Sequence, residues 1–461
     1  MSGSPDNTTP SEGVTRVRIQ TWAAGGRGLG RVDGRVWMVA GAVPGDDVSA
    51  RVVKDHGRFV EAVVESVERP SPSRRPPPCP IQRECGGCPL MVVSEAPQRS
   101  AKKQFLLDAL RRIGRLPEDL PVHDVVAAPT SVAYRNKIEL TFGRDRAGRR
   151  IVGYHRAGEP SALVDVTGCA IADSRLQPLL AAARAFFLHG PGSSEPAIDD
   201  GREGLRLVLR ASNARDERLI ALRGLPGPFQ AAEVFAQVAA KADPGLVGVV
   251  RLIASPGRRG GALVHTVAGR AWIADEIHGT SFRVPAATFL QVHAAAAEVL
   301  GRHVLEGAGS PRRVLELYGG IGALGLALAR RGARATIVDA DSAAIGCGIE
   351  AARSCGLTTA EFERAEVFAF LGSRRDGPTP DLVIADPPRT GLGRGVAERL
   401  AALGAARIAM ISCDPATLAR DLAALAARGY DVEQITPFDL FPQTAHVEAV
   451  AWLSRTAGPR S

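Results

Sequence analysis

Residues 312–332 read RRVLELYGGIGALGLALARRG, a pattern that predicts a buried β-strand, a glycine-rich turn and an α-helix in succession. Similar strand–helix patterns follow in 335–356 and 407–430, and between them 381–391 reads as a strand that ends in a polar turn. Repeated strand–helix units are typical of a parallel sheet with helices on both faces, whose ligands bind beyond the carboxyl ends of the strands. We therefore predict a Rossmann-like α/β domain over residues 296–461.

The rest of the chain divides into segments of different composition. Residues 14–70 alternate apolar and polar positions between turn glycines, which predicts a small β-barrel. The Pro-rich stretch 71–80 marks a linker. Residues 71–295 mix helical and strand patterns and are expected to form a central α+β domain, while 1–13 is predicted to be a disordered tail. The predicted fold class is therefore multidomain α/β.

Composition limits the class of protein. The chain has 461 residues, 45% of them hydrophobic, and its 57 Lys and Arg against 49 Asp and Glu give a net charge of +8. This charge favours a polyanionic partner, although an arginine-rich composition would produce the same value. The N-terminus lacks the basic and apolar regions of a signal peptide, and no uncharged apolar run of about 18 residues predicts a membrane span. The seven cysteines do not resemble a secreted disulfide framework, so a reducing cytoplasm is the expected location.

The glycine turn within 312–332 has features of a nucleotide-cofactor site. Gly320 and Gly322 allow the backbone to turn tightly and to approach a ligand closely. Asp339 ends the next predicted strand about 20 residues later, where a carboxylate can bind two ribose hydroxyls. A plain tight turn is the alternative, because glycine-rich turns after strands are common.

Two residues near the C-terminus suggest covalent group transfer. Cys413 lies between an apolar run and a predicted helix start, in ISCDPATLARDL, and Glu448 lies in a later apolar strand, HVEAV. A thiol nucleophile and a carboxylate base beside a cofactor pocket suit such a reaction. A buried core cysteine and a surface glutamate are the alternatives. His446 is expected on the same strand face as Glu448, either as an ordinary polar residue or as an orienting group.

Several motifs together resemble the S-adenosylmethionine-dependent RNA uridine-5-methyltransferase family. They are VLELYGGIG, VDAD, IADPPRTG, ISCDPATLARDL and DLFPQTAHVEAV, and their order and spacing match that family through the whole C-terminal domain. The segment FLQVH, at 289–293, resembles the stretch that leads into the family's catalytic domain. The resemblance implies that the cofactor is a sulfonium, S-adenosylmethionine, in place of a dinucleotide.

By motif position, the resemblance implies a set of cofactor-binding residues. Gln291 and Tyr318 would contact the methionine and adenosine parts, Asp339 the ribose, and Glu366 the adenine. Glu366 is equally readable as a solvated acid at a helix start. The complete set is Gln291, Tyr318, Gly320, Gly322, Asp339, Glu366 and Asp386.

The resemblance also implies a reaction. Cys413 would add to carbon 6 of uracil, so that carbon 5 becomes nucleophilic and takes the methyl group. Glu448 would then remove the carbon 5 proton, and Asp386 would hold the cofactor and the uracil edge together.

Three residues depart from the family's usual pattern. Glu316 stands in place of Asp, Gly319 in place of Cys, and Asp414 in place of Asn. A negative charge on Asp414 would oppose thiolate formation at Cys413 unless the side chain turns away.

Four cysteines have spacings typical of an iron–sulfur or zinc site. Cys79, Cys85 and Cys88 lie in CPIQRECGGC, and Cys169 lies in VTGCAI. This three-plus-one arrangement favours iron–sulfur over zinc, whose sites more often use two short paired spacings. The family resemblance implies a [4Fe-4S] cluster at these four positions.

The N-terminal barrel and the basic segment 99–160 indicate an RNA partner, although a solvated basic face is the plainer interpretation of that segment. GGRGLGRVDGRVWMV, at 25–39, resembles a TRAM domain, an OB-like barrel associated with RNA binding. A barrel with a cysteine cluster resembles enzymes that act on 23S ribosomal RNA more than those that act on transfer RNA. A non-catalytic RNA-binding assembly factor and a DNA or free-pyrimidine methyltransferase are the competing functions. No obligate protein partner is evident.

Overall fold

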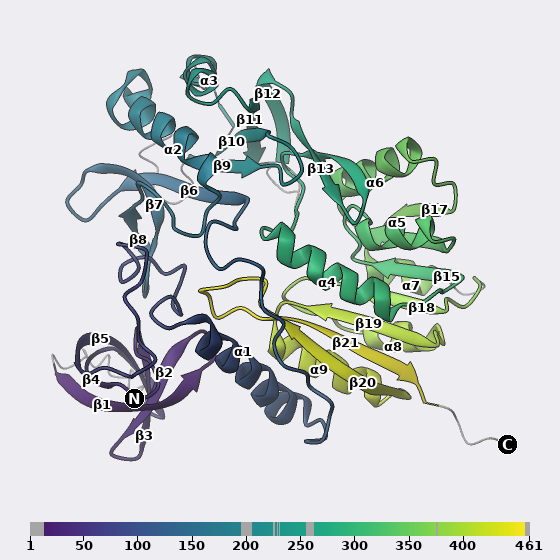
Figure 1. The fold of residues 1–461 in the computed structure, drawn as a ribbon, viewed down its shortest axis with the longest axis horizontal. Coiled ribbons are helices and arrows are strands. Elements are labelled where there is room, and N and C mark those ends of the chain that lie inside the picture. Colours follow the sequence, from purple (N-terminus) through teal and green to yellow (C-terminus); the bar gives the residue numbers. More distant parts are fainter. Residues whose placement is uncertain are drawn as a thin grey trace, which may run out of the picture.

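The computed structural model describes residues 13–194, 205–224, 226–227, 229, 231–254, 262–374 and 377–456. They form an N-terminal barrel, a central sheet and a C-terminal sheet, coloured purple, blue to teal, and green to yellow (Figure 1). The predicted tail lies outside the described residues apart from Gly13. No helix among the described residues is long and apolar enough to cross a membrane.

Five strands close into the N-terminal barrel, as the sequence predicts, in the order β1-β2-β3-β5-β4. Alternate side chains point inward and build a core that includes Val17, Trp37 and Val60. A Cβ at Gly30 would lie 2.4 Å from the carbonyl oxygen of Arg18, so glycine is needed where β2 passes β1. The strands are β1 (Val14–Ala23), β2 (Arg27–Val32), β3 (Arg35–Ala40), β4 (Asp47–Asp55) and β5 (Phe59–Arg69).

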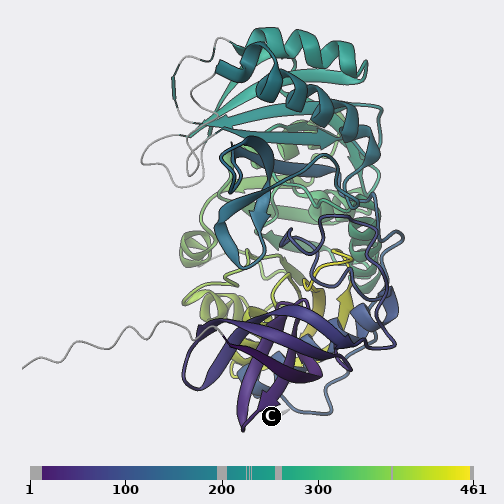
Figure 2. The same ribbon diagram turned by 90° about the vertical axis from the view of Figure 1, so that its left-hand side faces the viewer.

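A seven-stranded sheet forms the central part, in the order β12-β11-β10-β9-β6-β7-β8. Helices α2 (Gln177–Arg184) and α3 (Ala231–Ala242) pack against it through a core that includes Leu140, Phe187 and Phe235. Figure 2 shows this sheet at the opposite end of the molecule from the barrel. The strands are β6 (Lys137–Arg144), β7 (Arg150–Arg156), β8 (Glu159–Asp165), β9 (Arg206–Ala211), β10 (Arg218–Gly224), β11 (Leu246–Ala254) and β12 (Ala262–Gly269).

The C-terminal sheet has the order β17-β16-β15-β18-β19-β21-β20. Its strand pairs are parallel except at β21, which runs antiparallel to both neighbours. This arrangement confirms the predicted Rossmann-like fold. The strands are β15 (Arg313–Leu317), β16 (Arg334–Asp339), β17 (Ala360–Arg364), β18 (Leu382–Ala385), β19 (Arg407–Ser412), β20 (Tyr430–Phe438) and β21 (Glu448–Arg455).

Helices cover both faces of the C-terminal sheet. Apolar residues of α4 and α5 pack on one face, and those of α7, α8 and α9 pack on the other. A two-stranded ribbon, β13 (Trp272–Ile277) with β14 (Thr280–Pro285), precedes α4. The helices are α4 (Ala294–Gly307), α5 (Ala323–Arg330), α6 (Ser342–Ser354), α7 (Val367–Ser373), α8 (Val396–Ala402) and α9 (Pro415–Ala426).

Helix α1 (Glu95–Ala109) packs on the C-terminal domain, although it lies far upstream in the sequence (Figure 1). Leu106 of α1 belongs to the same buried cluster as Leu422 of α9. The basic segment that contains α1 is therefore partly internal. Lys102 is 0% exposed, and its Nζ donates to Asp439 Oδ1 at 2.5 Å.

Lys102→Met is expected to destabilise the folded protein by about 3–5 kcal/mol, because it leaves the buried Asp439 carboxylate without its partner. The measurement is the shift of the urea unfolding midpoint. Lys103→Met is the matched control, since Lys103 pairs with Asp124, whose side chain is 95% exposed. Equal midpoints for the two variants would contradict the assignment of a structural role to Lys102.

Candidate active site

The candidate site lies at the carboxyl ends of the parallel strands. In the strand register Leu317 of β15 pairs with both Val338 of β16 and Ala385 of β18. The next residues, Tyr318, Asp339 and Asp386, therefore leave three neighbouring strands at the same edge. This is the edge at which open α/β sheets bind their ligands.

A cavity of about 620 Å³ opens at this edge, within the roughly 300–1,000 Å³ range of small-molecule sites. Of the residues that the sequence assigns to the cofactor, Gln291, Tyr318, Gly320 and Asp386 line it, whereas Gly322, Asp339 and Glu366 do not. Glu366 is exposed at the start of α7, and its side chain does not cap that helix.

The glycine turn at the cavity has an unusual backbone. Gly320 and Gly322 have φ angles of +57° and +75°, as a tight turn requires. Tyr318 also has a positive φ, +57°, and its hydroxyl donates to the Leu392 carbonyl at 2.7 Å. Oδ2 of Asp339 accepts from the Gly320 amide at 2.8 Å, so this carboxylate braces the turn and retains further acceptor positions.

Two of the departures from the family pattern are complementary. Glu316 is buried, and its Oε2 accepts from the Gly325 amide at 2.8 Å. A Cβ at Gly319 would lie 3.0 Å from Cγ of Glu316 and 2.7 Å from Ile337 Cγ2. The side chain of Glu316, which is longer than that of aspartate, thus occupies space that a side chain at position 319 would need. Burial raises the pKa of Glu316 to about 8, and the hydrogen bond from Gly325 opposes that rise.

The central domain contributes one wall of the cavity through Asn213 and Ala214. Asp275 of β13 holds this wall, because its carboxylate accepts from Asn213 Nδ2 at 2.9 Å and from the Ala214 amide at 3.1 Å. Asn136 Nδ2 donates both to Asn213 Oδ1 and to the Gln291 carbonyl, at 3.2 Å each. Asn136 therefore links the wall to the segment that carries Gln291.

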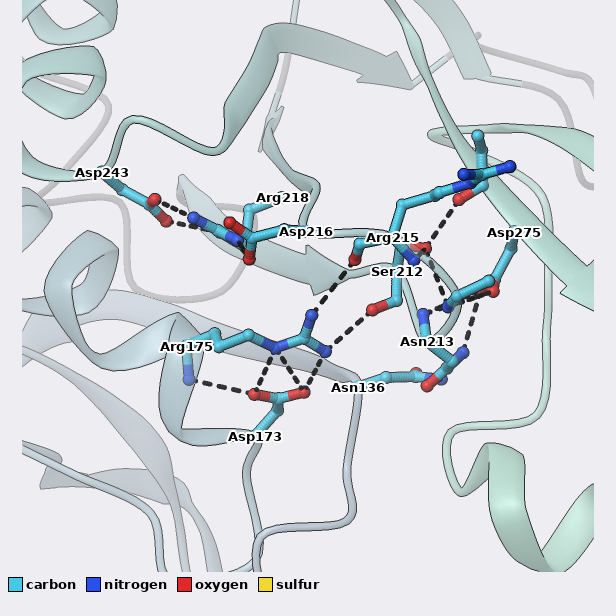
Figure 3. A network of polar contacts seen from close by, with 12 residues as sticks. Asn136, Asp173, Arg175, Ser212, Asn213, Arg215, Asp216, Arg218, Asp243 and Asp275 are labelled. Carbon is cyan, nitrogen blue, oxygen red and sulfur yellow. Dashed lines mark hydrogen bonds and ion pairs between the residues drawn. The ribbon is translucent and has the colours of Figure 1, made fainter.

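Figure 3 shows further hydrogen bonds, from Arg175, to the same segment of residues 212–215. Arg175 donates to the carbonyls of Ser212 at 2.8 Å and Arg215 at 3.2 Å. Asp173 holds the Arg175 guanidinium through Nη2 at 2.6 Å. These bonds fix the turn between β9 and β10 beside the cavity.

Cys413 and Glu448 lie at facing strand ends. Ser412 of β19 pairs with Ala449 of β21, and one further step along this antiparallel register sets Cys413 opposite Glu448. Cys413 is half-buried, whereas Glu448 is 1% exposed. Among the described residues, Oε2 of Glu448 has no hydrogen-bond partner.

Burial and nearby charged residues shift the pKa values of Cys413, Asp386 and Glu448. Burial and, to a lesser extent, the nearby Glu448 raise the pKa of Cys413 to about 11, and Arg389 opposes this rise. Burial also raises the pKa of Asp386 to about 7 and that of Glu448 well above its usual value, with Asp386 adding to the latter. The positive Arg389 acts on both Cys413 and Glu448, yet sequence reasoning gave it no role. Its place in IADPPRTG, three residues after Asp386, was the available indication.

Comparisons with known proteins show which family this chain belongs to. The sequence profile of the family described as tRNA (Uracil-5-)-methyltransferase matches residues 272–456. An uncharacterized RNA methyltransferase of Gloeobacter violaceus is 36% identical over 95% of this chain and 96% of its own length. Another, of Thermosynechococcus vestitus, is 36% identical over 96% of this chain and 98% of its own length. The chain belongs to the RNA uracil-5-methyltransferase family.

The fold agrees with a solved structure as well. The crystal structure of Pyrococcus abyssi tRNA (uracil-54, C5)-methyltransferase in complex with S-adenosyl-L-homocysteine has a TM-score of 0.72 and 24% identity, and the match covers 95% of this chain and all of that one. The protein is thus an S-adenosylmethionine-dependent RNA methyltransferase with the overall fold of that structure.

Activity of this methyltransferase is expected to rise with pH. The Cys413 thiol has a pKa of about 11, so the thiolate is a minor species at neutral pH and its fraction grows about tenfold per pH unit below that pKa. Rates of methyl transfer to RNA measured in single turnovers from pH 6.5 to 9 should climb throughout. Arg389→Gln should move the climb to higher pH, since it removes a charge that favours the thiolate. A rate that falls with pH would contradict this ionisation scheme.

The structure places His446 in a loop, whereas the sequence pattern predicts it on a strand. Strand β21 begins at Glu448, so His446 lies in the preceding loop and does not share a strand face with Glu448. Its Nε2 lies 3.5 Å from Nη2 of Arg389, and burial with that positive neighbour lowers the pKa of His446 to about 4. His446 is therefore neutral at physiological pH.

Asp414 is the N-cap residue of α9. Its Oδ1 accepts from the backbone amides of Ala416 at 3.0 Å and Thr417 at 2.9 Å, so the carboxylate faces the helix start. The Asp414 side chain is thus turned toward the start of α9. This is the arrangement in which its charge was not expected to oppose thiolate formation at Cys413.

Asp414→Asn is expected to change methyl transfer by less than about threefold, because asparagine caps a helix as well as aspartate does. Asp414→Ala should destabilise the protein by about 1 kcal/mol through loss of the cap. Steady-state rates and thermal unfolding of both variants test this. A large gain in rate for Asp414→Asn would show that the negative charge does restrain Cys413.

The four cysteines of the N-terminal half meet in space. Cys79, Cys85, Cys88 and Cys169 line one cavity of about 20 Å³, and all four are free thiols. Burial raises the pKa of Cys88 to about 12, and the neighbouring thiols add to that rise. Within the part of the chain that the structure describes, no group of three or more His, Cys, Asp or Glu residues is placed to hold a metal ion.

Proposed function

We propose that this enzyme methylates carbon 5 of a uridine in RNA through a covalent adduct between Cys413 and carbon 6 of the uracil. The observation that carries the proposal is the facing pair at the ends of β19 and β21, a thiol opposite a buried carboxyl with an unpartnered oxygen. Asp386, which lines the cofactor cavity, also acts on the ionisation of both groups. A nucleophile, a base and a cofactor cavity therefore meet at one strand edge.

The residues have distinct roles in the proposed reaction. The Cys413 thiolate forms an Sγ–C6 bond, and the electrons of the C5=C6 double bond move to make carbon 5 nucleophilic. S-adenosylmethionine, when bound, would supply the methyl group that carbon 5 takes, and S-adenosylhomocysteine would leave as the S–CH3 bond breaks. Glu448 then removes the carbon 5 proton, the C5–H electrons restore the C5=C6 bond, and the Sγ–C6 bond breaks to release the thiolate.

We assign the cavity at the strand edge to the cofactor. Gln291, Tyr318, Gly320 and Asp386 line it, and Gly322 lies between the lining residues Ile321 and Ala323. Asp339 braces the same turn and retains acceptor positions for a ribose hydroxyl. Glu366 is the outermost member of the set, and its exposed carboxylate suits a contact at the solvent side of the adenine.

Ribosomal RNA, most specifically 23S rRNA, is the proposed substrate, and transfer RNA is the alternative because the matching family profile bears a tRNA description. A second cavity, of about 610 Å³, lies between the barrel and the cysteine segment and is lined by Arg27, Arg74, Arg75 and Arg83. Arginines along a groove suit an RNA backbone, and the barrel resembles a TRAM domain. An RNA substrate of this kind places the proposed action in the cytoplasm.

A [4Fe-4S] cluster is proposed at Cys79, Cys85, Cys88 and Cys169. Its support is the convergence of four free thiols on one small cavity. The three-plus-one spacing of the four cysteines favours this cluster over structural zinc, whose sites more often use two short paired spacings. Anaerobic purification with iron and sulfide analysis tests the cluster, and stoichiometric zinc without iron would contradict it.

Mass mapping of modified nucleotides in RNA from cells with and without the gene tests the function. The expected result is loss of one 5-methyluridine from 23S rRNA. Loss of a 5-methyluridine from tRNA would support the alternative substrate. Unchanged RNA would contradict methyl transfer to RNA and favour a non-catalytic assembly factor or a DNA or free-pyrimidine methyltransferase.

A further inference from the structure

The loop of residues 439–447 joins β20 to β21 and leads directly to Glu448. Phe438, the last residue of β20, pairs with Glu448, the first residue of β21. The conformation of this loop therefore influences where the backbone of Glu448 lies. Oε2 of Glu448 has no hydrogen-bond partner among the described residues, so that carboxyl oxygen gains no positional restraint from a hydrogen bond there.

Gln443 at the centre of the loop is fully buried and has a φ of +71°, a left-handed conformation that is strained for a residue other than glycine. It exchanges two hydrogen bonds with the side chain of Gln98 of α1. Gln98 Nε2 donates to Gln443 Oε1 at 2.9 Å, and the backbone N–H of Gln443 donates to Gln98 Oε1 at 2.8 Å. Gln98 is also 0% exposed. Surrounding contacts thus hold the loop in a conformation that it would not adopt alone.

Residues from the cysteine region hold the same loop. The Leu90 amide, two positions after Cys88, donates to the Gln443 carbonyl at 3.0 Å. The Tyr134 hydroxyl donates to the Pro442 carbonyl at 3.0 Å, and the Tyr134 ring belongs to a buried cluster against which Cys88 packs. The loop before the base is therefore fastened by the N-terminal half of the chain.

The elements that flank the nucleophile lie outside this loop. Cys413 follows β19 and precedes α9, whose start is capped by Asp414. Loosening the loop should consequently displace Glu448 while Cys413 keeps its place.

We propose that the Gln98–Gln443 pair positions Glu448 for the elimination step, so that α1 and the cysteine segment control release of the methylated RNA. This inference rests on the proposed function, in which Glu448 takes the carbon 5 proton and the Sγ–C6 bond then breaks. Without the pair, addition and methyl transfer still occur, but proton removal slows and the covalent intermediate accumulates. Gln98 and Gln443 are positioning residues, since neither lines the cofactor cavity.

The test compares Gln98→Ala with Gln104→Ala. Both residues lie on α1, but Gln104 is exposed and its side chain donates to Asp108 and not to the loop. Each full-length variant is incubated with S-adenosylmethionine and total RNA from cells lacking the gene, and SDS-resistant protein–RNA complex is quantified. For Gln98→Ala we expect turnover to fall about tenfold, KM for RNA to change little, and the complex to accumulate. Gln104→Ala should behave as the unaltered enzyme.

Two further variants distinguish failure of the proposed chemistry from failure of the positioning inference. Glu448→Gln must itself accumulate the complex, and if it does not, the proposed role of Glu448 as the base fails. If Glu448→Gln accumulates the complex and Gln98→Ala does not, the positioning inference alone is overturned. Should Gln98→Ala fail to fold, judged by circular dichroism, Tyr134→Phe removes only the bond to the Pro442 carbonyl. Accumulation in that variant would support the inference, and unaltered turnover without accumulation would overturn it.

Discussion

Cys413→Ala is expected to lower methyl transfer to RNA by about 10⁴-fold or more, because without the thiolate carbon 5 of uracil stays a poor nucleophile. The measurement is transfer of labelled methyl from S-adenosylmethionine to RNA from cells lacking the gene. Cofactor binding should persist, since Cys413 does not line the cofactor cavity.

Cys355→Ala is the matched control for this prediction. Cys355 is an exposed free cysteine at the end of α6, outside the proposed site, and its loss should leave the rate unchanged. Full activity in Cys413→Ala or Cys413→Ser would rule out the covalent mechanism.

Glu448→Gln is expected to reduce turnover by about 10²–10⁴-fold, the usual contribution of a general base. The amide keeps the size of the carboxyl but cannot take the carbon 5 proton, so elimination stops after methyl transfer. The measurement is twofold: steady-state turnover, and the yield of methylated RNA that remains attached to the protein in SDS.

Glu433→Gln provides the control, since Glu433 pairs with Arg407 at the surface of β20 and is remote from the strand ends. That variant should turn over normally. Loss of turnover in Glu448→Gln with neither adduct nor methylated RNA would contradict the role of Glu448 as the base and suggest that it acts earlier in the reaction.

The α/β fold was predictable because its causes are local. The mostly apolar residues at 314–317 and the glycines at 320 and 322 predict a strand and a turn, and the structure has both. Repeated strand–helix units then leave few possible topologies, since parallel strands need crossover helices. The closed barrel followed in the same way from alternating residues and turn glycines.

The remaining features depend on contacts between distant parts of the chain. Helix α1 packs on α9 because its apolar face complements that helix, and nothing within 95–109 identifies the partner. The pairing of Gln98 with Gln443 joins positions 345 residues apart. His446 was expected on a strand, but β21 starts two residues later, because an apolar pattern does not locate the first paired residue of a strand.

Some features of the site residues were also predictable from the sequence, and others were not. Motif positions placed Tyr318, Asp339 and Asp386 at strand ends, and the strand register agrees. Sequence patterns could not show that Glu316 uses the space left by Gly319, since this depends on three-dimensional packing. The role of Asp414 as a helix cap was missed, although an Asp followed by Pro at a predicted helix start is the usual sequence signal for it.

The central claim is a covalent bond between Cys413 and the target uracil, and one measurement tests it most directly. RNA that carries 5-fluorouridine is incubated with the enzyme and S-adenosylmethionine, and the digested complex is analysed by mass spectrometry. Fluorine at carbon 5 cannot be removed as a proton, so the adduct should persist. We predict a peptide in which Cys413 carries one methylated fluorouridine. The absence of an adduct, or its attachment to another cysteine, would contradict the account.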